Sequence, residues 1–85
     1  MIFEDKKEYE LFARVDFANE SDTYVNLTVT LLDDSIANIK INNEAYQLIT
    51  LGKLYYMEVS CKNNGTRNQL FIKKFQDAFN MELDE

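Results

Sequence analysis

The sequence contains no histidine, no proline and no tryptophan, and only one cysteine and two glycines among its 85 residues. Without histidine, the chain lacks the commonest general base and the usual side-chain ligand of zinc. Its single cysteine, Cys61, excludes an internal disulfide, is expected to be buried, and fits a reducing compartment. Gly52 and Gly65 lie too far apart to form a phosphate-binding loop. These absences predict a protein that is not an enzyme and holds no cofactor.

The sequence also shows no feature of a metal site or of a membrane protein. Asp33 and Asp34 are adjacent carboxylates, whereas calcium needs oxygen ligands spaced along a loop, so we interpret the two acids as part of a turn. No apolar run approaches the roughly 20 residues that a membrane-spanning helix needs. The first residues, MIFEDKKEYE, are too charged for a secretory signal. We therefore expect a cytoplasmic protein without a bound metal.

Charge is acidic in total but unevenly distributed. The net charge of -6 argues against nucleic acid, because binding to a polyanion depends largely on lysine and arginine. Between Lys6 and Phe75, however, nine acidic and nine basic side chains balance. Residues 16–34 carry five acids and no base, whereas residues 59–75 carry four bases and no acid. The sequence therefore predicts a bipolar molecule that is locally basic near its C-terminal end.

Three stretches in the first half alternate between apolar and polar residues, the pattern of half-buried β-strands. They cover residues 8–18, 23–32 and 36–41. Short turns rich in Asn, Asp and Ser join them, so the sequence predicts a three-stranded meander. In the first stretch, the residues expected to face the core are Tyr9, Leu11, Ala13, Val15 and Phe17.

The spacing of apolar residues becomes helical over residues 42–52. Asn42 or Asn43 can cap a short helix or helical turn, and Gly52 suits its end.

Strand alternation returns over residues 54–62 and 68–75, and Asn64 with Gly65 suits the tight turn between them. We expect the last residues, 76–85, to form a C-terminal helix with an acidic tail.

The order of these elements resembles the OB-fold, a five-stranded partly open barrel. Residues 33–75 are similar to the second half of an OB domain in replication protein A and related single-stranded DNA-binding proteins. In that family an acidic turn precedes strand three, and the connecting helix ends near a step that is GKLYY here, residues 52–56. The resemblance implies a mostly β fold: a single domain over residues 1–85 with an OB-like barrel over residues 8–75. An α+β meander sheet packed by a helix is the alternative.

The resemblance also implies a binding face. Proteins hold single-stranded nucleic acid with aromatic side chains that stack on bases and basic side chains that contact phosphates. The side chains of these kinds that are expected on the outer strand faces or in turns are Phe12, Arg14, Lys40, Tyr56, Lys62, Arg67, Phe71 and Lys73. Tyr24 also faces outward, but acids flank its strand and it is not included. Alternatively, the C-terminal helix covers Phe12 and Phe71, and the basic residues only solvate the surface.

Two functions fit the sequence. In the first, an OB-fold module binds single-stranded DNA or RNA without catalysis, with residues 62–74 as its basic surface. In the second, an acidic inhibitor or adaptor, of a kind that phages and mobile elements encode, uses residues 16–34 to bind a basic cleft of a partner protein. An exposed strand edge could also pair with a second copy and give a homo-oligomer. The local basicity of residues 59–75 favours nucleic acid.

Overall fold

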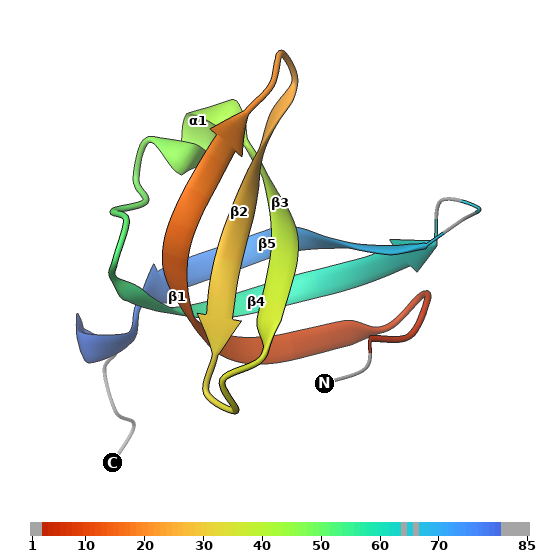
Figure 1. Ribbon diagram of the computed structural model, residues 1–85, viewed down its shortest axis with the longest axis horizontal. Coiled ribbons are helices and arrows are strands. Elements are labelled where there is room, and N and C mark those ends of the chain that lie inside the picture. Colours follow the sequence, from red (N-terminus) through yellow and green to blue (C-terminus); the bar gives the residue numbers. More distant parts are fainter. Residues whose placement is uncertain (1–2, 64, 66, 81–85) are drawn as a thin grey trace.

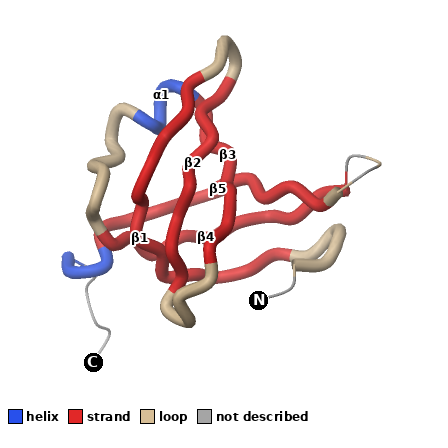
Figure 2. The backbone as a smooth tube through the Cα atoms, viewed as in Figure 1, coloured by secondary structure: helices blue, strands red, loops and turns tan. Residues whose placement is uncertain are grey.

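A computed structural model describes residues 3–63, 65 and 67–80 of the chain. Five β-strands form a closed barrel in the order β1-β2-β3-β5-β4 (Figures 1 and 2). A short helix follows β3, and one turn of 3-10 helix follows β5. The elements are β1 (Glu8–Glu20), β2 (Tyr24–Leu31), β3 (Ile36–Asn42), α1 (Asn43–Tyr46), β4 (Leu54–Asn63), β5 (Asn68–Asp77) and η1 (Ala78–Asn80).

The barrel closes where the last two strands meet the meander. β1, β2 and β3 pair in chain order as antiparallel neighbours, as predicted. β4 then pairs with β1, while β5 lies between β4 and β3 and runs parallel to β3, with Ile39 next to Leu70. This is the connectivity of the OB-fold. The predicted barrel is confirmed, and the alternative sheet covered by a helix is not the fold of this chain.

Apolar positions from all five strands fill the inside of the barrel. Burial alternates along β2 and β4 because successive side chains of a strand point to opposite faces. Cys61 is buried among these residues, as predicted, and burial raises the pKa of its thiol. The core consists of Leu11, Ala13, Val15, Val25, Leu27, Val29, Leu31, Ile39, Ile41, Tyr55, Met57, Val59, Cys61 and Leu70.

Strand β1 departs from the predicted alternation after Val15. Val15 lies opposite Val29, and Phe17 lies opposite the neighbouring residue of β2, so the register shifts by one. Asp16 is the extra residue of a β-bulge, which bends the strand and exchanges its two faces beyond this point. Phe17, which we predict to face the core, is instead 70% exposed, so that prediction is wrong. Ala18 packs against the core in its place.

The insert between β3 and β4 begins as a single helical turn. Asn42 caps it, because its side-chain oxygen accepts a hydrogen bond from the Ala45 N–H at 2.7 Å. Gly52 lies near the end of the following loop with a φ of +86°, a left-handed conformation that glycine adopts without strain. Its N–H donates to the Val15 carbonyl. The predicted short helix and the glycine turn are confirmed.

The C-terminal end differs from the predicted helix over residues 76–85. Gln76 and Asp77 extend β5, because they pair with the two tyrosines near the start of β4. Within the described residues one 3-10 turn follows, in which the Phe79 N–H donates to the Asp77 carboxylate. The prediction is wrong for residues 76–77, and its part over residues 81–85 lies outside the described residues. In the described part of the chain, no helix has the length and apolarity needed to span a membrane.

Candidate nucleic-acid interface

The outer surface of β2, β3 and β5 carries polar and aromatic side chains from all three strands. The hairpin register places Asn26 opposite Lys40 and Thr28 opposite Asn38. The parallel pairing of β3 with β5 places Phe71 beside Lys40. Directly paired residues project from the same face of a sheet, so these side chains form one surface. We call it the β2–β3–β5 face and define it by Tyr24, Asn26, Thr28, Asn38, Lys40 and Phe71.

Lys40 lies between two aromatic rings on this face. Its ammonium nitrogen is 4.2 Å from the centre of the Tyr24 ring and 5.8 Å from the centre of the Phe71 ring. Both distances fall within the range of cation–π attraction, which contributes roughly 0.5–1 kcal/mol at an exposed site. These contacts restrict a long and otherwise mobile side chain. The three residues form a preorganised cluster of one positive charge and two rings.

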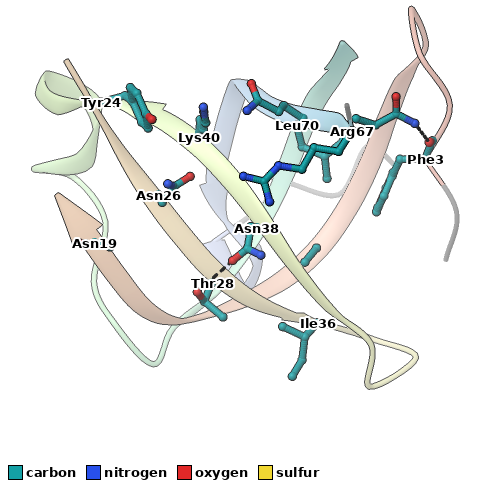
Figure 3. Close-up of a pocket in the computed structure, with 13 residues that line it drawn as sticks. Phe3, Asn19, Tyr24, Asn26, Thr28, Ile36, Asn38, Lys40, Arg67 and Leu70 are labelled. Carbon is teal, nitrogen blue, oxygen red and sulfur yellow. Dashed lines mark hydrogen bonds between the residues drawn. The ribbon is translucent and has the colours of Figure 1, made fainter. Parts of the chain in front are cut away.

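A groove of about 640 Å³ adjoins this cluster (Figure 3). Its walls come mainly from β2, β3 and the first residues of β5, with Phe3 of the N-terminal segment also lining it. The Arg67 side chain extends across the groove toward Asn38 in Figure 3. The volume lies in the range of pockets that hold small ligands, which is large enough for a nucleobase.

Hydrogen bonds orient two of the amide side chains in this groove. Thr28 Oγ1 donates to Asn38 Oδ1 at 3.2 Å, so the amide nitrogen of Asn38 points away from Thr28. Asn68 Nδ2 donates to the Phe3 carbonyl oxygen at 2.7 Å and ties the N-terminal segment to β5. Oriented amides can donate to, or accept from, the polar edges of bases. The groove therefore offers hydrogen bonding next to the aromatic rings.

Phe12 and Tyr56, two of the predicted site residues, form a separate aromatic pair on β1 and β4. They are opposite each other on β1 and β4, with their ring centres 5.5 Å apart. Burial, and to a lesser extent Glu10, raises the pKa of Tyr56. Phe71 lies opposite Ser60, four residues further along β4, which is about 13 Å at 3.3 Å per residue. The structure therefore separates the predicted aromatic residues into two clusters.

The basic residues near the β4–β5 hairpin also point in different directions. Lys73, the extra residue of a second bulge, contacts the Glu8 carboxylate, which raises the lysine pKa. The Lys74 ammonium nitrogen lies 3.7 Å from a Glu58 carboxylate oxygen. Glu8 of β1 and Glu58 of β4 therefore offset the positive charges of Lys73 and Lys74. Arg67 instead lines the groove of the β2–β3–β5 face.

Arg14 and Lys62 complete the set of predicted site residues, and neither lines the groove. Arg14 Nε donates to Asp16 Oδ1 at 2.7 Å. Lys62 is exposed near the end of β4. The predicted residues that the structure brings together around the β2–β3–β5 face are therefore Lys40, Arg67 and Phe71.

Tyr24, Asn26 and Asn38 lie on the β2–β3–β5 face but are not among the site residues predicted from the sequence. Acids flank the strand of Tyr24 in the sequence, yet Lys40 is the charged group over its ring. The register of the β2–β3 hairpin is the information that would have identified these residues. The short turn after β2 determines which residues of β3 lie opposite Asn26 and Tyr24.

The acidic stretch 16–34 does not form one face. Glu20 lies at the end of β1 and Asp22 in the connection to β2 (Figure 1). Asp33 and Asp34 lie in the turn after β2, at the other end of that strand. A partner that needed the whole stretch as one acidic surface would not find it here.

Acidification is expected to destabilise the barrel partly through Asp16. Arg14, and then the Thr30 hydroxyl, hold the pKa of this carboxyl below its usual value. A carboxyl whose pKa is lower in the folded state contributes stability above its unfolded pKa of about 3.9, and this contribution is lost as the pH falls through the folded value. The free energy of unfolding, measured with urea at a series of pH values, should therefore decrease below about pH 4. Asp16→Asn should flatten this decrease, and Asp22→Asn, which leaves the Arg14 contact intact, should preserve more of it.

No family model matches the sequence, and no curated protein matches it either. Solved structures do match. Two crystal forms of Rim1, a mitochondrial single-stranded DNA binding protein from S. cerevisiae, each superpose with a TM-score of 0.70. The matches cover 87% of this chain and 94% and 95% of the yeast chains, at 20% and 19% sequence identity. The chain thus has an OB-fold similar in shape to that of Rim1.

Proposed function

We propose that this protein binds single-stranded nucleic acid on the β2–β3–β5 face, without catalysing a reaction. The observation that carries the proposal is the cluster of Lys40 between the rings of Tyr24 and Phe71, beside a polar groove lined by Arg67. Aromatic rings provide stacking surfaces for bases of any sequence, and basic side chains contact the phosphates between them. The cluster supplies both kinds of contact within a small area.

Overall acidity does not oppose this proposal. Lys40 and Arg67 line the groove, whereas the carboxylates Glu8 and Glu58 contact Lys73 and Lys74 of β5. Electrostatic attraction falls off within a Debye length of about 10 Å at 0.1 M salt, so the local charge matters more than the net charge. The likeness in fold to Rim1, a mitochondrial single-stranded DNA binding protein, also supports the proposal.

The salt dependence of binding tests this function. A fluorescently labelled oligonucleotide of about 20 bases exceeds the ~4–16 nucleotides that one OB-fold occupies. If Lys40 and Arg67 each neutralise one phosphate, a plot of log Kobs against log salt should have a slope of about -1.4, since each contact contributes about -0.7 on a single strand. Fluorescence anisotropy at several salt concentrations measures this slope.

Two variants locate the contact. Arg67→Ala should reduce the slope by about 0.7 in magnitude. Lys74→Ala removes a basic residue from the same strand-turn-strand unit, but on the side that faces Glu58, and should leave the slope unchanged. An absence of binding to the oligonucleotide, or binding that does not respond to salt, would refute the proposed function. Equal effects of the two variants would refute its assignment to the β2–β3–β5 face.

A further inference from the structure

Three exposed apolar side chains from distant segments line a second groove, at another place on the barrel. Leu32 in the β2–β3 turn is 72% exposed, Leu51 in the loop before β4 is 51% exposed, and Phe79 in η1 is 81% exposed. Single exposed apolar residues are ordinary on protein surfaces, but a group of them around one concave site is typical of an interaction surface. This groove has a volume of about 670 Å³, and among the residues that the structure describes it shares no lining residue with the groove beside Lys40.

Charged side chains define the chemistry of this second groove. Arg14 and Lys53 line it together with the carboxylate of Asp34. The Arg14 and Lys53 side chains are 55% and 41% exposed, although Asp16 and Asp77 respectively contact them. A guanidinium has five N–H donors, and the contacts of Arg14 shown here involve Nε with Asp16 and Nη2 with Thr30. The wall with Arg14 and Lys53 therefore retains capacity for a further carboxylate.

We propose that this groove binds a short segment of a partner protein that combines apolar side chains with carboxylates. The apolar side chains would cover Leu32, Leu51 and Phe79, and a carboxylate would meet Arg14 and Lys53. The proposal goes beyond nucleic-acid binding, and its site is independent of the β2–β3–β5 face.

A pair of synthetic peptides tests the chemistry of the groove. DLFDLLE carries apolar and acidic residues, and KLFKLLK keeps the apolar residues and reverses the charge. With the full chain labelled with nitrogen-15, DLFDLLE should shift the amide signals of Leu32, Leu51 and Phe79 in a titration, and KLFKLLK should not. No localised shift with DLFDLLE, or equal binding of both peptides, would overturn the proposal.

Matched variants test the location. Leu51→Asp and Leu32→Asp place a negative charge on the groove and should each weaken DLFDLLE binding at least about tenfold, which corresponds to 1.4 kcal/mol. Leu48→Asp changes a side chain that is 73% exposed and outside the groove, and should not weaken it. Each variant should keep oligonucleotide affinity, which separates this test from that of the proposed function. An equal loss with Leu48→Asp would overturn the proposal. A shift of the Leu32 amide signal when residues 81–85 are deleted, with no peptide present, would also overturn the proposal. The chain's own tail would then be the occupant of the groove.

Discussion

Alanine in place of Tyr24 is expected to weaken binding to a single-stranded oligonucleotide by about 5- to 150-fold, which corresponds to the 1–3 kcal/mol that one stacked base contributes. Phe71→Ala should have an effect of the same order, because both rings lie around the Lys40 ammonium group. The double variant need not show the sum of the two losses, since the residues share Lys40 and neighbouring contacts couple. Fluorescence anisotropy at constant salt measures the affinities.

Two control variants show whether the loss of affinity is specific to the aromatic ring at Tyr24. Tyr24→Phe keeps the ring and should retain most of the affinity, because the stacking surface and the cation–π contact that Tyr24→Ala removes are both preserved. Tyr56→Ala removes the same side chain from the other aromatic cluster, where Tyr56 contacts Phe12. It should leave affinity unchanged. Should Tyr56→Ala abolish binding while Tyr24→Ala preserves it, the interface lies on β1 and β4 and the β2–β3–β5 face is not the binding surface.

The fold was largely predictable because nearly every strand follows a simple rule. Along β2 and β4 each second residue is apolar and buried, and turn-forming residues separate the strands. The helical turn at residues 43–46 was predictable from the Asn42 cap. These signals are local, so one sequence suffices to detect them. The resemblance to OB domains then supplied the order in which the strands pair.

The candidate site was less predictable because it depends on pairing between strands that are distant in sequence. Alternation correctly places Phe12 and Phe71 outside the core, but it does not say which outer side chains are neighbours. Phe71 meets Lys40 through the parallel pairing of β5 with β3, and that pairing involves only a short stretch of the two strands. The same arrangement turns Lys73 toward Glu8 instead of toward the groove.

The β-bulges in β1 and β5 limit how far the alternation of apolar and polar residues predicts which side chains face the core. Barrel strands must bend, and a β-bulge bends a strand while adding one residue to it. β1 contains no glycine and bends at Asp16, and β5 has its extra residue at Lys73. Neither residue type marks a bulge in a sequence. Every inward or outward assignment beyond such a point is therefore reversed, as Phe17 illustrates.

The largest loss of stability is expected when Leu27, a fully buried residue of β2, becomes alanine. Leu-to-Ala substitutions in a core cost about 2–5 kcal/mol, because they remove buried apolar surface and leave a cavity. A domain of this length has a total stability of roughly 4–13 kcal/mol at ~0.05–0.15 kcal/mol per residue. Leu27→Ala should therefore lower Tm by at least about 8 °C, at roughly 4 °C or more per kcal/mol. Thermal and urea unfolding followed by circular dichroism measure both quantities.

Phe17→Ala should be measured beside Leu27→Ala, because strict alternation and the observed bulge predict opposite effects of Phe17→Ala on the free energy of unfolding. A phenylalanine facing the core would cost about 3–5 kcal/mol on truncation. The exposed Phe17 of this structure should change the free energy of unfolding by no more than about 0.5 kcal/mol. A loss comparable to that of Leu27→Ala would mean that β1 continues without a bulge at Asp16. Because β1 pairs with both β2 and β4, the end of the barrel beyond Asp16 would then have a different register.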